Sequence, residues 1–311
     1  VFNIYEVNLK NNKETQLTNS EEESFFVNGY APSTNEVFYS ADKGGNENSH
    51  IYLIRNNETV DLTPGENTKA SFFGWTQDEQ DMYVLSNSRD PRFFDLYKIN
   101  ILTLESVMVY KNDKGYSLNS ISNNDKHLVL NLNLSRSEQK LFLYEIKSKQ
   151  QFEISNQTAN YSGQNFDKND ENFLYTTNYD SEFYYLMSYN LNNGDRSIVY
   201  KTNWDVAFSY LSKNDSFRVV AVNEDAQNKI IIKNMNDQSD LNLIGLENMN
   251  INRVAFSDDE KMIRISAGSP NSPGDIYTYN LSTNKLNKIT TNLNSSVNPD
   301  DLVNAEVIRY E

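Results

Sequence analysis

The chain has 311 residues and a formal net charge of -15, from 43 acidic and 28 basic side chains. This length suits two ordinary domains or one large all-β domain, and the acidic balance argues against nucleic acid or an anionic membrane as a partner. The absence of cysteine excludes disulfides and thiolate metal sites, and no apolar run is long enough to predict a membrane span.

A short alternating strand pattern recurs seven times along the chain. Subtracting neighbouring positions of its first apolar residue gives intervals of 47, 45, 45, 45, 44 and 46 residues. A second strand pattern, rich in apolar residues on both faces, repeats with almost the same period. Such regular spacing indicates a repeat architecture. The marker positions of the first pattern are Ile4, Ile51, Leu96, Leu141, Leu186, Ile230 and Ile276.

Each full repeat contains four strand signals, A to D, separated by short polar turns. Repeats of about 45 residues with four strands and no helical periodicity predict an all-β fold, a seven-bladed β-propeller of four-stranded antiparallel blades. One blade is expected to be incomplete because no A–B hairpin precedes Ile4. The predicted propeller covers 1–292, with a half blade at 1–20 and full blades at 21–66, 67–113, 114–158, 159–204, 205–247 and 248–292.

The count of strands also bears on the ends of the chain. Seven C–D pairs but only six A–B pairs predict that the parent protein begins roughly 20 residues earlier, the length of one hairpin at this period. Residues 293–311 offer at most one more strand. We interpret them as a linker or strand toward a further domain.

Candidate binding residues lie in the B–C loops, which differ between repeats while the A–B turns are alike. Variable loops on a rigid scaffold tend to carry function. Carboxylates there could hold a substrate amine, and arginines a carboxylate or carbonyl; the alternative is that these side chains pair with one another. The candidates are Glu47, Arg89, Arg92, Glu182, Glu224 and Asp225.

Catalytic and metal-binding signatures are missing from the sequence. No Gly-x-Ser-x-Gly nucleophile elbow occurs, and the nearest segment, 115–119, lacks its second glycine. Two isolated histidines, His50 and His127, do not make a usual zinc site without cysteine. We therefore predict no catalytic residues, no metal and no cofactor. An acidic pair of the glycosidase type stays open because carboxylates are plentiful.

Several segments together resemble the N-terminal propeller of bacterial serine peptidases of the prolyl oligopeptidase family. They are 39–47, 89–97, 204–206, 223–226 and the tail 298–310. The nearest branch is similar to acylaminoacyl-peptidases and dipeptidyl-aminopeptidases. The resemblance implies a C-terminal α/β-hydrolase domain that carries the catalytic triad, which this chain lacks, and short peptides as substrates.

The leading hypothesis is therefore a propeller that gates and selects substrates for a serine peptidase and is inactive by itself. Two alternatives stay open: a stand-alone, protein-binding scaffold of the TolB-like kind, and a propeller polysaccharide lyase or glycosidase. The sequence leaves the compartment open between cytoplasm and periplasm.

Overall fold

The computed structural model describes residues 1–247, 249–298, 301–303 and 305–309. These residues divide into two compact units, which are described separately. Unit 1 comprises Val1–Asn133 and Phe142–Glu153, and unit 2 comprises Leu134–Leu141 and Ile154–Glu311. The described part of the chain has no helix long and apolar enough to cross a membrane.

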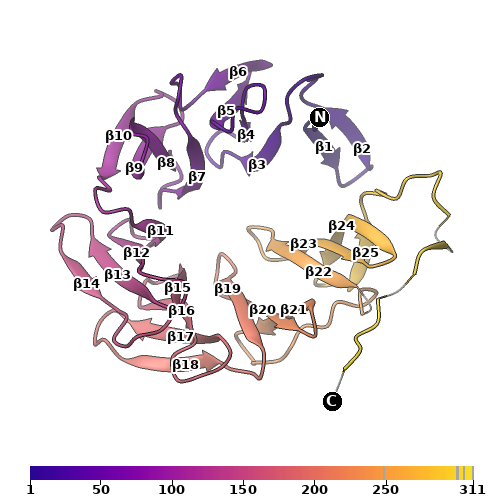
Figure 1. The fold of residues 1–311 in the computed structure, drawn as a ribbon. Helices are drawn as coiled ribbons and strands as arrows, with labels where there is room; N and C mark the ends of the chain where they lie inside the picture. The colour runs from indigo at the N-terminus through magenta and orange to yellow at the C-terminus, as the bar shows by residue number, and fades with distance from the viewer. Residues whose placement is uncertain (248, 299–300, 304, 310–311) are drawn as a thin grey trace. The chain divides into compact units, whose positions relative to one another are not determined.

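Unit 1 consists of antiparallel sheets whose strands follow chain order (Figure 1). A two-stranded sheet comes first, and two four-stranded sheets follow it. Their strands are β1 (Tyr5–Asn8), β2 (Lys13–Gln16); β3 (Phe26–Tyr30), β4 (Val37–Ala41), β5 (His50–Arg55), β6 (Glu58–Asp61); β7 (Ala70–Trp75), β8 (Asp81–Asp90), β9 (Phe93–Asn100) and β10 (Ser106–Tyr110). The next sheet runs in the order β11 (Ser117–Ile121), β12 (His127–Asn133), β13 (Gln139–Glu145) and β14 (Gln151–Glu153).

Unit 2 continues the same pattern with two four-stranded sheets and one of three strands. Their strands are β15 (Tyr161–Phe166), β16 (Asn172–Thr177), β17 (Tyr185–Asn190), β18 (Arg196–Tyr200); β19 (Asp205–Leu211), β20 (Phe217–Glu224), β21 (Gln227–Asn234); β22 (Asn250–Phe256), β23 (Met262–Ser269), β24 (Ser272–Asn280) and β25 (Lys285–Lys288). No strand occurs among the described residues after Lys288. Part of the expected tail strand, at 299–300, 304 and 310–311, lies outside the described residues.

The structure confirms four-stranded antiparallel blades but corrects their number. The described residues form six blades rather than seven, because the Ile4 repeat supplies only the β1–β2 hairpin. The 205–247 repeat, expected to be complete, has three strands, and its fourth is reduced to a single bridge between Lys233 and Asp240.

The hairpin turns repeat in backbone conformation as well as in length. Each A–B turn has one residue with a positive φ and each C–D turn has at least one, the β5–β6 turn having both Asn56 and Asn57; this geometry lets a short loop close without splaying its strands. Polar residues and glycine fill most of these positions. In the A–B turns they are Asn35, Glu79, Asp125, Asp170, Asp215 and Glu260, and in the C–D turns Asn12, Asn57, Leu104, Lys149, Gly194, Gln238 and Asn284.

The periodic marker residues lie in the cores of their sheets. Ile51, Leu96, Leu141 and Leu186 are fully buried. In four repeats the marker's backbone N–H donates to a Ser or Thr hydroxyl that follows the fourth strand, as from Ile51 to Thr63 Oγ1 at 2.9 Å. The same bond recurs for Ile4, Leu141 and Ile276. The 45-residue period in the sequence therefore corresponds to a site in the blade where the same packing and the same hydrogen bond recur.

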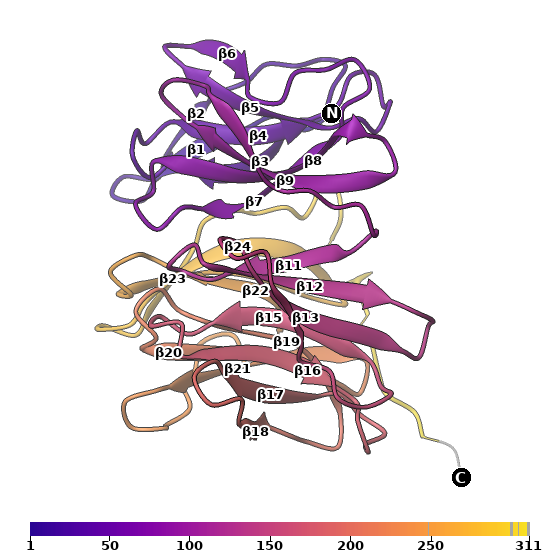
Figure 2. The same cartoon turned by 90° about the vertical axis from the view of Figure 1, so that its left-hand side faces the viewer.

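Neighbouring sheets within each unit pack face to face through apolar side chains. In unit 1, Phe38 of β4 meets Trp75 of β7 with ring centroids 5.4 Å apart. In unit 2, Leu174 and Leu186 share a core with Val220. The sheets that contribute these residues, β15–β18 and β19–β21, lie side by side (Figure 1, Figure 2). Turns add polar contacts: Lys168 N–H donates to Asp215 Oδ2 at 2.7 Å, and Asn214 N–H to Glu260 Oε1 at 2.6 Å.

Candidate functional site

Arg89 and Asp95 form a partly buried ion pair at the end of the β8–β9 hairpin. Arg89 donates from Nε and Nη2 to the two Asp95 oxygens at 2.6 and 2.9 Å, and from Nη2 to the carbonyl of Asn112 at 3.1 Å. Asp95 is fully buried and also accepts the Asn112 N–H at 2.7 Å. This pair raises the pKa of the Arg89 guanidinium further. The predicted substrate ligand Arg89 is thus engaged inside its own blade.

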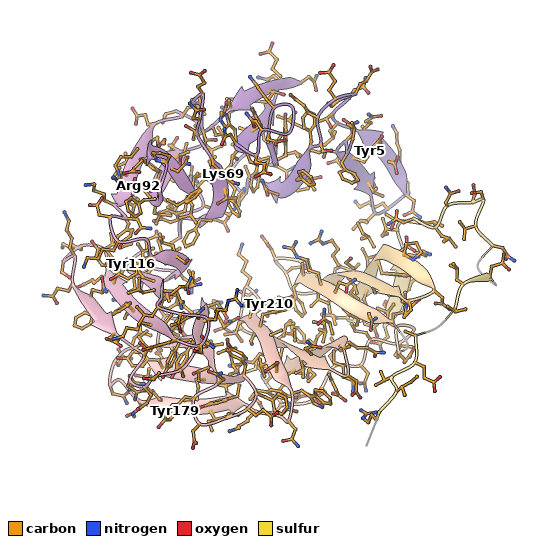
Figure 3. All side chains as sticks on the ribbon, viewed as in Figure 1. Tyr5, Lys69, Arg92, Tyr116, Tyr179 and Tyr210 are labelled. Atoms are coloured by element: carbon orange, nitrogen blue, oxygen red, sulfur yellow. The ribbon has the colours of Figure 1, made fainter. Side chains whose placement is uncertain are left out.

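Arg92 and Glu47, also in unit 1, are more available. Arg92 occupies the turn between β8 and β9, where Figure 3 labels it. Its side chain is 75% exposed, pairs with Asp90 at 2.8 Å and lies over the Phe93 ring at 5.1 Å. The Arg92 bonds hold the pKa of Asp90 well below its usual range. Glu47 is exposed at φ 60° in the β4–β5 loop, where its N–H donates to Asp42.

Of the three candidate carboxylates in unit 2, two pair with a cation and the third is exposed. Glu224, at the end of β20, pairs with Lys229 at 2.5 Å. Asp225 lies in the β20–β21 turn at φ 51° and pairs with Arg309 of the tail at 2.5 Å. Glu182 is exposed in the β16–β17 loop. Arg89 and Arg92 share the β8–β9 hairpin, and Glu224 and Asp225 share the β20–β21 hairpin.

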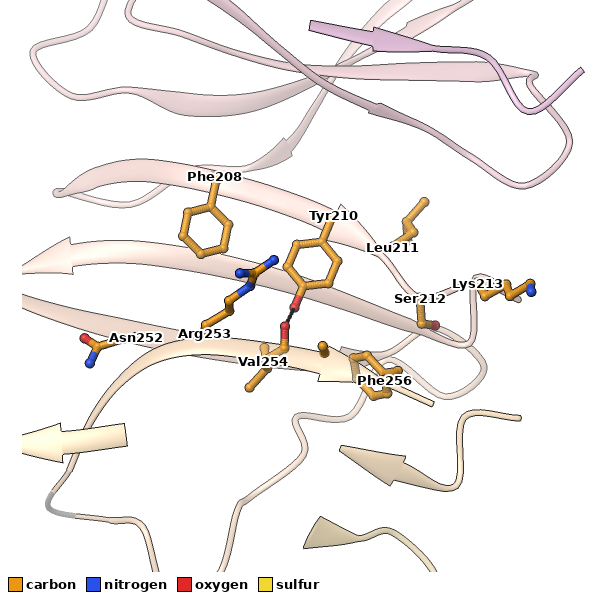
Figure 4. Close-up of a pocket in the computed structure, with 10 residues that line it drawn as sticks. Phe208, Tyr210, Leu211, Ser212, Lys213, Asn252, Arg253, Val254 and Phe256 are labelled. Carbon is orange, nitrogen blue, oxygen red and sulfur yellow. Dashed lines mark hydrogen bonds between the residues drawn. The ribbon is translucent and has the colours of Figure 1, made fainter. Parts of the chain in front are cut away.

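A concave feature lies in unit 2 between the first strands of two neighbouring blades. A cavity of about 580 Å³ is lined by residues of β19 and β22 and of the turn after β19 (Figure 4). Tyr210 of β19 crosses it and donates its hydroxyl to the carbonyl of Val254 at 2.5 Å. Burial raises the pKa of Tyr210 to about 12, so the phenol stays protonated and keeps donating at physiological pH.

The cavity offers binding chemistry rather than a hydrolytic site. Phe208, Tyr210 and Phe256 supply apolar rings, and the exposed Asn252 and Arg253 supply donors. Ser212 is buried; its hydroxyl accepts the Phe217 N–H at 2.9 Å and is also bonded to the Glu260 carboxylate, so it takes part in the contacts between neighbouring A–B turns, and no histidine lines the cavity. Among the described residues, no three His, Asp or Glu side chains come together to hold a metal.

Sequence reasoning searched the B–C loops and passed over this cavity, because its residues belong to strands. A signal was nevertheless present. The repeats before β22 place Leu118, Gly163 and Phe208 at spacings of 45 residues, and the next step of 45 gives Arg253. A departure from the repeat was thus visible in the sequence.

Comparisons with known proteins agree with this architecture. Residues 16–292 match the family model described as prolyl oligopeptidase, N-terminal beta-propeller domain. Dipeptidyl aminopeptidase BIII of Pseudoxanthomonas mexicana is 30% identical over 87 residues, which are 27% of this chain and 12% of that protein.

Solved structures share the fold at low identity. A chain from a structural study of two prolyl endopeptidases matches with a TM-score of 0.70 and 12% identity, over 92% of this chain and 46% of that one. An oligogalacturonate lyase from Vibrio parahaemolyticus matches with a TM-score of 0.66 and 13% identity, over 95% of this chain and 86% of that one. The chain thus spans less than half the length of the prolyl endopeptidase.

Proposed function

Because the chain belongs to the family of prolyl oligopeptidase N-terminal β-propeller domains, we propose that it admits and selects short peptides for a serine peptidase. The catalytic groups would reside in a C-terminal α/β-hydrolase domain of the same parent chain. Residues 1–292 would form the propeller, and 293–311 would lead toward that domain. The family match over residues 16–292 is the observation that carries the proposal.

Exclusion is the physical basis of the proposed selection. Sheets with continuous apolar cores and turns bonded to one another open locally only at a cost in free energy. A rigid propeller beside an active site would admit a peptide of a few residues and exclude a folded protein. Residues on the loops between the second and third strands would then contact the substrate, with Glu47, Arg92 and Glu182 the least engaged by their own neighbours.

The test compares the 311-residue chain with a version extended through the proposed hydrolase domain. We expect the extended protein to cleave peptides of a few residues and the 311-residue chain to cleave none. In a length series, cleavage by the extended protein should fall steeply as substrates grow. Hydrolysis by the 311-residue chain would contradict the proposed division of labour. Equal cleavage of short peptides and folded proteins by the extended protein would contradict the selecting role.

A further inference from the structure

Two arginines of unit 2, Arg253 on β22 and Arg264 on β23, lie on the same face of one sheet. Arg253 is directly opposite Ser266 in the antiparallel register, and Arg264 is two residues from Ser266 along β23. Residues two apart on a strand share a face. Diagonal neighbours of this kind lie within reach of each other when their side chains are long. Both arginines and Ser266 line a second cavity of about 420 Å³.

Neither arginine has a carboxylate partner among the residues that the structure describes. Four other arginines are paired with carboxylates: Arg55 with Glu36, Arg89 with Asp95, Arg92 with Asp90 and Arg309 with Asp225. What sets Arg253 and Arg264 apart is that two such cations lie on one sheet face without a carboxylate between them. The protein around Arg264 lowers the pKa of its guanidinium by desolvation, and the charge of Arg253 lowers it further. An uncompensated pair of like charges is unusual in a chain with 43 acidic residues and 28 basic ones.

The repeat itself marks Arg264 as a departure. It lies two residues before Ser266, the residue of the second strand that pairs with the marker Ile276, just as Phe38 lies two residues before Ser40, the partner of Ile51. The five earlier blades place a buried apolar side chain at that position. These are Phe38, Tyr83, Val129, Leu174 and Val219. In the sixth blade this position holds a cation, which is not stabilised by burial among apolar side chains. The exception therefore favours a role for Arg264 in binding.

We propose that Arg253 and Arg264 form a binding site for a carboxylate, and that its natural ligand is the C-terminal carboxylate of a short peptide. Two guanidinium groups present several donors in fixed planes, which suits a planar oxyanion. Ser266 lies between them on the sheet face, and Asn252 lines the same cavity. Cavities of this size hold small ligands.

The charge of the protein favours a small carboxylate over a polyanion. A net charge of -15 repels nucleic acids and polyphosphates at long range. A zwitterionic peptide carries no net charge and is therefore not repelled by the protein as a polyanion would be. The choice of a peptide rests on the proposed function, whereas the carboxylate site does not depend on it.

Calorimetric titration tests the site with three probes: trialanine, trialanine C-terminal amide and acetate. We expect trialanine to bind, and amidation to weaken its binding about tenfold or more because the oxyanion is lost. Arg253→Gln and Arg264→Gln should each weaken binding by a similar factor. Lys285→Gln, an exposed residue on β25 of the same sheet, removes the same charge and should leave the affinity within about twofold.

Thermal melting separates binding from folding defects. Arg264→Gln should raise the melting temperature of the ligand-free protein, because it removes one of two like charges, and should abolish the further rise caused by trialanine. Equal binding of trialanine and its amide, or unchanged binding by both arginine variants, would overturn the site. If acetate binds through both arginines and trialanine does not, the peptide is overturned as the ligand while the carboxylate site stands.

Discussion

Replacing Arg89 with alanine should destabilise the blade β7–β10 far more than replacing Arg92 in the same hairpin. Removing Arg89 leaves Asp95 fully buried without its cation and removes two charge-assisted bonds of 2.6 and 2.9 Å. Breaking one side of a buried ion pair costs about 3–5 kcal/mol. Arg92 is 75% exposed, and an exposed pair such as Arg92–Asp90 contributes about 0–1 kcal/mol.

Urea unfolding followed by Trp75 fluorescence measures this difference, because Trp75 lies on β7 of the same blade. A Trp204→Phe background removes the other tryptophan, which lies in unit 2. The double variant Arg89→Ala with Asp95→Ala completes a cycle that isolates the pair from general truncation. If Arg89→Ala costs no more than Arg92→Ala, the ion pair does not support the fold, and Arg89 returns as a candidate for substrate binding.

Three further outcomes follow from the turns and from contacts between blades. Leu104 is exposed and has a φ of 62°, a conformation that strains any residue with a side chain. Leu104→Gly should therefore raise the free energy of unfolding by about 0.5–1 kcal/mol in urea melts, and Leu104→Val should lower it. Arg55→Lys should cost about 1–2 kcal/mol in the same assay, since lysine cannot keep two bonds to Glu36 and one to the carbonyl of Ile101; a neutral result would contradict this account. Burial raises the pKa of Asp215 in the folded protein above its value of about 3.9 in the unfolded chain. At a pH above the folded-state pKa the buried carboxylate is charged and destabilises the folded protein, whereas at a pH below about 3.9 it is protonated in both states and has no effect. Asp215→Asn keeps an acceptor for Lys168 N–H and should therefore melt higher than the parent near neutral pH but not at about pH 3, and a lower melting temperature at both would refute the assignment.

The sequence predicts the scaffold well because one packing solution is repeated. The marker residues Ile51, Leu96 and Leu141 all lie in sheet cores at the expected third strand. The predicted number of blades, seven, was wrong because the half blade at 1–20 was counted as a blade of its own. The Ile4 repeat makes a single hairpin, as the predicted half blade implies, and the 205–247 repeat has three strands and one isolated bridge in place of its fourth.

The candidate site was harder to predict because loop composition does not reveal which charges are already paired. Arg89 and Glu224 look available in the sequence, yet each is bonded to a neighbour in its own hairpin. Glu47 and Glu182 are exposed as expected, but exposure alone does not assign a ligand. Whether the six predicted residues contact a substrate stays a prediction.

In a repeat protein, residues that build the scaffold can be distinguished from residues that carry function, because scaffold residues recur in every blade. Residues that recur every 45 positions are explained by the contacts that every blade must make, such as the bond from Ile51 N–H to Thr63. Function then belongs to positions where the repeat is broken without a structural gain. Arg264 breaks it where the earlier blades bury an apolar side chain, and Arg253 brings a second cation to the same sheet face. Neither has a carboxylate partner among the described residues. Charged residues on variable loops break no such rule, because loops have no repeated packing to preserve. The strand arginines are therefore a more discriminating indication of a binding site in this chain than the loop residues.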